Sequence, residues 1–162
     1  LKISEKNFIK AMNSFVGLPH RYEFFLKRKN IIFINDSKAT SFQAAKYALS
    51  SNKNIYWILG GLPKENDQIV LREVKKNIIK CYLIGNNINY FKKQIKNKIN
   101  FSVSTHLKDS IIKILRDIRL FNKKNNTILL SPAAASYDQF INFEKRGDEF
   151  KRLFKIYQKK YI

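Results

Sequence analysis

The sequence predicts an α/β domain of three layers, with a mostly parallel sheet covered by helices on both faces. Apolar β-type runs alternate with stretches of helical period along most of the 162 residues, and this order is typical of parallel sheets. Only a short turn at 28–30 separates the first two apolar runs, which predicts one antiparallel edge strand. A hydrophobic content of 44% at this length allows one domain with a buried core.

The chain opens with a predicted amphipathic helix at 4–15, in which Ser4 is the N-cap and Phe8, Ile9, Met12 and Phe15 share one face. Gly17-Leu18-Pro19 then interrupts the chain, as a hinge or a domain junction would. Runs of apolar and β-branched residues predict strands at 22–27, 31–34, 55–59, 80–84 and 127–130, with a weaker strand at 100–104.

Between these strands, helical periodicity predicts helices near 41–51, 68–77, 89–98, 107–121 and 144–159. The helix at 107–121 has the clearest pattern, because one stripe carries Ile111, Ile114, Leu115 and Ile118. Aromatic residues recur at helical spacing near the end of the chain, and we interpret them as core residues: Phe140, Phe143, Phe150, Phe154 and Tyr157.

The composition argues against several classes of protein. No apolar run approaches the roughly twenty residues that span a membrane, and the first residues lack the apolar segment of a signal peptide. The single cysteine, Cys81, lies in the apolar run 78–84, so we expect a buried thiol and a cytoplasmic protein without internal disulfides. The chain begins with Leu1 and not Met, which we interpret as a fragment of a longer protein.

A formal net charge of +20 has two possible explanations. One is a nucleic-acid partner, which clustered lysine and arginine would indicate. The basic residues are instead spread over nearly every segment, and a codon bias toward A/T would also enrich lysine. We therefore favour solvated faces over a nucleic-acid groove, with a positive field that gathers anionic substrates.

Polar residues of types suited to binding or catalysis follow the strand predicted at 31–34. The sequence Asn35-Asp36-Ser37-Lys38-Ala39-Thr40 brings a carboxylate, an ammonium and two hydroxyls to the carboxyl end of that strand. Ligands bind beyond this end of the strands in open α/β sheets. The motif alone is equally compatible with a helix cap.

Two further strand ends carry similar features. Gly60-Gly61 lets the backbone turn sharply after the strand at 55–59, and Lys64 follows on that turn. Small residues follow the strand at 127–130, where Ser136 is positioned to cap a helical turn whose free N–H groups attract anions. Each feature alone also fits a plain turn or a capped helix. Together with Lys38 and Thr40 they form a suitable site for a small dianion.

Other motifs are less informative by themselves. His20-Arg21 follows the hinge, and His20 alone is typical of an exposed turn. Arg146-Gly147 has the character of a surface turn. No catalytic triad, metal-ligand cluster or P-loop (GxxxxGK[ST]) is present, so a nucleoside triphosphate would need its main phosphate site elsewhere.

Three motifs in this order resemble the C-terminal domain of the Mur ligases, the amide-bond-forming enzymes of peptidoglycan synthesis. They are GLPHR at 17–21, NDSKAT at 35–40 and SPAAASYDQFINFEKRG at 131–147, supported by Gly60-Gly61 and Lys64. The segment 35–40 is most similar to the members that add D-glutamate. Ser41, Leu62-Pro63 and Ala134 depart from the usual residues, which bears on the fine geometry of the substrate site.

The resemblance implies a Rossmann-like fold, with residues 17–162 as the C-terminal domain that binds the incoming amino acid. Residues 1–16 would be the tail of the central ATPase domain or a linker helix. ATP and Mg²⁺ would be bound mainly by that missing central domain, and UDP-N-acetylmuramoyl-L-alanine by a missing N-terminal domain. The fragment alone would then be inactive.

The resemblance also implies roles for individual residues. Lys38 would be catalytic, stabilising charge between the amino acid and the phosphate. D-glutamate would be bound by Thr40, Lys64, Ser136, Tyr137 and Phe143, the last two through their backbone. His20, Arg21 and Asp36 would face the nucleotide, and no residue of the chain is expected to bind a metal.

Two alternatives remain at this point. One is a related amide ligase, such as a folylpolyglutamate synthase-like enzyme. The other is a basic Rossmann-like module that binds nucleic acid, although such a module explains none of the three strand-end motifs.

Overall fold

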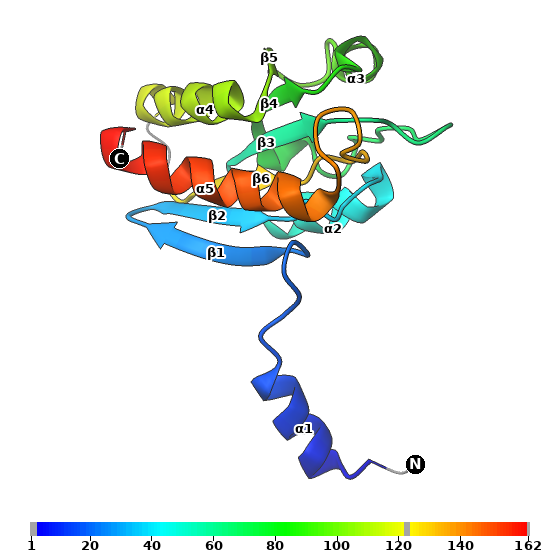
Figure 1. The fold of residues 1–162 in the computed structure, drawn as a ribbon, viewed down its shortest axis with the longest axis vertical. Helices are drawn as coiled ribbons and strands as arrows, with labels where there is room; N and C mark the ends of the chain where they lie inside the picture. Colours follow the sequence, from blue (N-terminus) through cyan, green and yellow to red (C-terminus); the bar gives the residue numbers. More distant parts are fainter. Residues whose placement is uncertain (1–2, 122–123, 162) are drawn as a thin grey trace.

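The computed structural model describes residues 3–121 and 124–161, and a six-stranded sheet forms its centre (Figure 1). The strands lie in the order β1-β2-β6-β3-β4-β5. The pair β1–β2 is antiparallel and the other pairs are parallel, which confirms the predicted sheet. The strands are β1 (Glu23–Arg28), β2 (Ile31–Asn35), β3 (Ile55–Gly60), β4 (Ile78–Ile84), β5 (Phe101–Thr105) and β6 (Asn126–Leu130).

Helices cover both faces of the sheet and complete the three layers (Figure 1). Helices α2 (Phe42–Ser51) and α3 (Ile88–Ile95) pack on the face that presents Trp57, Cys81 and Leu129. Helices α4 (Leu107–Phe121) and α5 (Phe143–Tyr161) pack on the face that presents Tyr56 and Ile128. Both faces of β3 and β6 are fully buried, which explains why these strands read as unbroken apolar runs.

Helix α1 (Glu5–Ser14) lies apart from the sheet in Figure 1, joined to it by the segment that contains the predicted hinge. Ser4 caps it as expected, with its Oγ 3.4 Å from the N–H nitrogen of Asn7. No side chain of α1 is buried, and Phe8, Ile9 and Met12 are each at least half exposed. No helix within the described residues is both long and apolar enough to cross a membrane.

The prediction of a helix at 68–77 is wrong. The structure has only a short 3-10 helix, η1 (Lys75–Asn77), in this connection. Its backbone is held by other partners, since the N–H of Ile69 donates to Oε1 of Gln94 on α3 at 2.6 Å. Ile69, Leu71 and Val74 are still buried in the core, so the segment covers the sheet without forming a regular helix.

Candidate functional site

The three polar segments predicted at strand ends lie beside one another, because β2, β6 and β3 are neighbours in the sheet and run parallel. Their carboxyl ends therefore share one edge. We call the segments that leave this edge the β2 loop (36–41), the β3 loop (61–67) and the β6 loop (131–142). This arrangement satisfies the spatial requirement of a site built from all three motifs.

Backbone hydrogen bonds join the β3 loop to the β6 loop. Leu62 N–H donates to the Ala135 carbonyl at 2.8 Å, and Ala135 N–H donates back at 2.9 Å. Gly61 has a φ of +136°, and a Cβ placed there would lie 2.2 Å from the Ala135 oxygen. Only glycine fits this close approach of two chains. The Gly60-Gly61 motif therefore fixes the position of the β3 loop that carries Lys64.

Asp36 joins the β2 loop to the β6 loop. Its N–H donates to the Leu130 carbonyl at 2.7 Å, and its carboxylate accepts from the Ser131 hydroxyl at 2.7 Å and from the Tyr22 N–H at 3.0 Å. Burial raises the pKa of Asp36, while these two hydrogen bonds and the charge of Arg21 oppose the rise. Both carboxylate oxygens are therefore occupied within the protein.

Arg146 connects the β2 loop to the β6 loop from within the core, although its sequence had the character of a surface turn. The side chain, on α5, is 1% exposed. Its Nε donates to the Ser37 hydroxyl at 3.0 Å, and its Nη2 donates to the carbonyls of Ser37 (2.8 Å) and Ala134 (2.9 Å). The remaining nitrogen, Nη1, lies 3.1 Å from where a Cβ on Gly61 would stand. Desolvation lowers the pKa of Arg146 to about 10, so the guanidinium remains charged at neutral pH.

His20 is buried, so its interpretation as an exposed turn histidine is wrong. Its Nδ1 lies 2.9 Å from the side-chain nitrogen of Asn35. Gly147 makes this position possible, because a Cβ there would lie 2.2 Å from Nδ1 of His20. A glycine inside a long helix beside an arginine was the one sequence signal that α5 closely approaches this part of the site.

Glu23 holds the His20 and Asn35 pair in place. Its carboxylate accepts from His20 N–H (3.0 Å), Asn35 Nδ2 (2.9 Å) and Lys151 Nζ (3.1 Å). Partial burial raises the pKa of Glu23, but the hydrogen bonds and the charge of Lys151 outweigh it and bring the pKa below 4.5. A lowered carboxyl pKa contributes stability above the unfolded-state pKa, and that contribution disappears as the pH falls through the folded-state value.

We expect Glu23→Gln to lower the free energy of unfolding of this chain by about 1 kcal/mol at neutral pH, since one charged acceptor of several hydrogen bonds is lost. The difference from the unchanged chain should shrink as the pH falls well below 4.5. Urea unfolding at both pH values measures it. Glu149→Gln, which removes an exposed pair with Arg152, is the matched control and should cost less. A difference independent of pH would contradict this account.

The side chain of Lys38, which belongs to the β2 loop, lies over the start of α5. Its ammonium stands 3.8 Å from the ring centroid of Phe143, the first residue of that helix. The Phe143 carbonyl accepts from the Ser37 hydroxyl at 2.8 Å. The N–H groups of a helix's first turn have no partner within the helix and attract anions. The Lys38 ammonium and these N–H groups therefore bring positive charge to the same end of α5.

Three of the predicted substrate-binding side chains have unused polar groups. Within the described part of the chain, no residue hydrogen bonds to or pairs with the side chain of Thr40, Lys64 or Ser136. Ser136 is only 2% exposed, whereas Lys64 is exposed and Thr40 half-buried. Tyr137 is 70% exposed. These side chains contrast with Asp36 and His20, whose polar atoms already have partners.

The motif at 35–40 is by sequence alone equally compatible with a helix cap, but the capping residue is the one that follows it. Ser41 caps α2, accepting from the Ala44 N–H at 3.3 Å, so Asp36 and Ser37 are not caps. Ser136 precedes a turn and not a helix: its carbonyl accepts from Gln139 and Phe140. Helix α5 begins only at Phe143, where Asn142 accepts from the Lys145 N–H at 2.8 Å.

A metal ion finds no ready-made site in this part of the protein. No group of three or more His, Cys, Asp or Glu side chains that could hold one occurs within residues 3–121 and 124–161. Asp36, the carboxylate of the β2 loop, has both oxygens engaged by protein donors.

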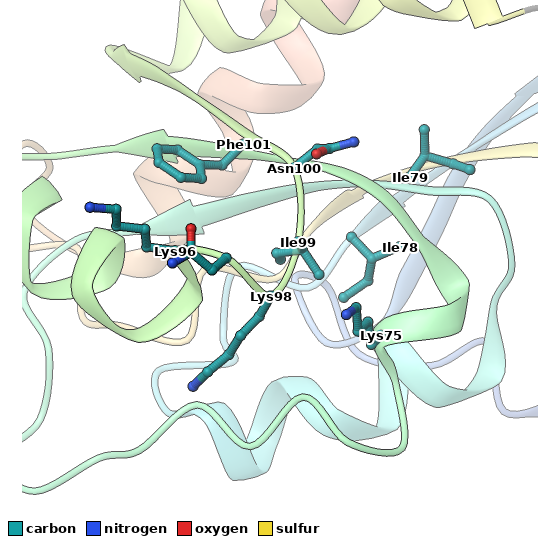
Figure 2. A pocket seen from close by; sticks show the side chains of 9 residues that line it. Lys75, Ile78, Ile79, Lys96, Lys98, Ile99, Asn100 and Phe101 are labelled. Atoms are coloured by element: carbon teal, nitrogen blue, oxygen red, sulfur yellow. The ribbon is translucent and has the colours of Figure 1, made fainter.

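A cavity of about 660 Å³ lies at the opposite edge of the sheet, where β4 and β5 begin (Figure 2). Its walls include Ile78, Ile99 and three lysines. Figure 2 shows Lys96 and Lys98 extending away from the two isoleucines, so their amines do not converge. None of the three loops contributes to this cavity, which is separate from the candidate site.

The chain is similar over nearly its whole length to curated ligases. It is 41% identical over 154 residues to the UDP-N-acetylmuramoylalanine--D-glutamate ligase of Wolbachia sp. subsp. Brugia malayi, covering 95% of this chain and 31% of the relative. For the ligase of the same name from Rhizobium meliloti the identity is 40% over 148 residues, with 91% and 32% covered. The chain belongs to the Mur ligase family.

The UDP-N-acetylmuramoylalanine--D-glutamate ligase of Rickettsia felis is 36% identical over 153 residues, and this chain covers 34% of its length. This Mur ligase chain therefore spans about a third of the length of the curated relatives it matches. No model of a known protein family matches the chain. The family membership agrees with the resemblance that the motifs at 17–21, 35–40 and 131–147 indicated.

Proposed function

We propose that this chain is the C-terminal, amino-acid-binding domain of an ATP-dependent ligase that adds D-glutamate to UDP-N-acetylmuramoyl-L-alanine in peptidoglycan synthesis. Residues 17–162 form this domain, and residues 1–16 belong to the central ATPase domain or to a linker helix. The observation that carries the proposal is the meeting of three motif-bearing loops at one sheet edge, where Thr40, Lys64 and Ser136 have unpartnered polar groups.

The chemistry joins a carboxylate to an amine. ATP, bound mainly by the central domain, supplies the phosphoryl group that makes the carboxylate of UDP-N-acetylmuramoyl-L-alanine an acyl phosphate. The D-glutamate amine then attacks the acyl carbon, and the tetrahedral intermediate expels phosphate and loses a proton to give the amide. Because the reactants are anionic, positioning and charge neutralisation supply most of the catalysis.

The amino acid is held by the three loops in this proposal. Lys64 supplies the charge for one carboxylate, while the hydroxyls of Thr40 and Ser136 donate hydrogen bonds to the carboxylates. Tyr137 and Phe143 contribute through their backbone; this suits Phe143, whose ring already contacts Lys38. A site with one exposed lysine and two hydroxyls suits a small dicarboxylate.

The nucleotide side of the site is assigned to His20, Arg21 and Asp36. Arg21 is the exposed member of the three, so it is best suited to reach a γ-phosphate. His20 and Asp36 are mostly buried, at 7% and 8% exposure, and present only an edge to a ligand. Closure of the central domain about residues 17–19 completes the site. Mg²⁺, which the family chemistry requires, is assigned to the missing domain.

Replacing Lys64 with alanine in the whole ligase should raise the KM for D-glutamate roughly tenfold to a hundredfold, the effect of losing a charge-assisted hydrogen bond. The KM for ATP should change little. Steady-state kinetics with each substrate varied in turn measure both constants. Lys53→Ala, which removes an exposed lysine at the opposite end of β3, is the control. Unchanged constants in the Lys64 variant would remove Lys64 from the site.

The function itself is tested by the choice of substrates. The whole ligase is assayed with D-glutamate and other amino acids, against UDP-N-acetylmuramoyl-L-alanine and folate acceptors. Preference for D-glutamate on the UDP-sugar supports the proposal, and activity on folates would favour the folylpolyglutamate synthase-like alternative. The purified domain alone should form no amide, because the ATPase half of the site is absent.

A further inference from the structure

The β3 loop carries Lys64 on a turn that ends at Asp67. The Asp67 N–H donates to the Lys64 carbonyl at 3.2 Å and closes this turn. Lys64 itself is exposed and has no side-chain partner among the described residues. Where its ammonium stands therefore depends on how the turn is anchored.

The side chain of Asp67 anchors the turn to α2. Its Oδ2 accepts from the N–H of Phe42, the first residue of that helix, at 2.8 Å. Ser41 already accepts from Ala44 at this terminus, so Asp67 supplies a second acceptor from another segment of the chain. Its negative charge also matches the positive end of the helix. Thr40 lies two residues before Phe42 in the chain, in the segment that leads into α2.

The backbone of Asp67 is fixed from the other side by α3. The Asp67 carbonyl accepts a hydrogen bond from the Tyr90 hydroxyl and a longer one, 3.4 Å, from Nε2 of Gln94. Gln94 also accepts from the N–H of Ile69 through its Oε1, so it bridges the residues that follow the turn. Asp67 is thus held at both its carboxylate and its carbonyl, between α2 and α3.

We propose that Asp67 is a positioning residue for the amino acid: it fixes the Lys64 turn against the Thr40 segment, so that both reach the same substrate. The inference rests on the proposed function, in which Lys64 and Thr40 bind D-glutamate. Asp67 itself does not touch the substrate. A purely structural cap of α2 would stabilise the fold without favouring one substrate over another.

The two roles separate in the kinetics of the whole ligase. Asp67→Ala should raise the KM for D-glutamate about fivefold to tenfold, as expected when a charge-assisted hydrogen bond that sets the geometry is lost. The KM values for ATP and for the UDP-sugar should stay within about twofold, a change too small to signify a lost contact. Asp67→Asn keeps an oxygen that can accept from Phe42 and should restore most of the affinity. If the alanine variant does not fold, Asp67→Glu, which displaces the carboxylate by one methylene, gives the same readout.

The double variant Lys64→Ala/Asp67→Ala tests whether Asp67 acts on substrate binding through Lys64. If Asp67 acts through Lys64, the double variant shows no higher KM for D-glutamate than Lys64→Ala alone. Glu73→Gln is the control, because it removes the same charge from an exposed carboxylate that pairs with Lys46 of α2 at 2.8 Å. It should leave every KM unchanged.

Two outcomes overturn the inference: a lower melting temperature in Asp67→Ala with an unchanged KM for D-glutamate, or equal increases for all three substrates. Both would leave Asp67 as a structural cap. If Lys64→Ala itself leaves the KM for D-glutamate unchanged, it is the proposed function of the site that fails.

Discussion

Replacing Lys38 with alanine in the whole ligase is expected to lower kcat by roughly a hundredfold to a thousandfold, the usual effect of losing a charge aimed at the transition state. The ammonium is held 3.8 Å from the Phe143 ring centroid, at the N-terminus of α5. A fixed cation at the N-terminus of α5 would stabilise negative charge that develops during transfer of the acyl group to the amine. The KM for D-glutamate should change much less than kcat.

Lys46→Ala is the matched control for this experiment. Lys46 lies on α2 and pairs with Glu73 at 2.8 Å, so its removal deletes the same charge away from the three loops. Its kcat should equal that of the unchanged ligase. A Lys38 variant that keeps its kcat and differs only in the KM for D-glutamate would make Lys38 a binding residue and not a catalytic one.

The second large effect is on stability. Arg146→Ala should lower the free energy of unfolding of the domain by about 3–5 kcal/mol, because it leaves a cavity and unpaired buried carbonyls at Ser37 and Ala134. Arg146→Lys keeps the charge but presents a single ammonium. It cannot replace the fork that binds Ser37 and Ala134 together, so it should recover only part of the loss.

Urea or guanidinium unfolding of the purified domain measures these differences. Arg116→Ala is the control: Arg116 is exposed on α4, and its loss should change the free energy of unfolding by less than about 0.5 kcal/mol. Equal stabilities for the Arg146 and Arg116 variants would show that Arg146 does not connect the loops.

Local patterns in the sequence predicted most of the elements correctly. The long periodic helices at 107–121 and at the end of the chain were found because side chains three and four residues apart share a face. The turn between β1 and β2 is short, so their antiparallel pairing was also local information. The segment at 68–77 was predicted wrongly, because its apolar residues are buried by tertiary contacts that no periodicity records.

The site was predictable in part for the same reason. Thr40, Lys64 and Ser136 each follow a recognisable apolar strand, so their place at a strand end could be derived from the sequence. That these three ends are adjacent depends on β6 inserting between β2 and β3, a pairing of segments about 70 to 95 residues apart. Local sequence contains no signal for such a pairing.

The sequence by itself determined the class of fold, the strand ends that carry polar groups and, through the motifs, the family. The tertiary structure alone decided that Arg146 is a buried connection between loops and that Gly147 makes room for His20. It also decided that Asp67 caps a helix from another segment. The physical reason is that burial and hydrogen bonding between distant segments depend on the packing of the whole chain, whereas a sequence pattern reports only on neighbours.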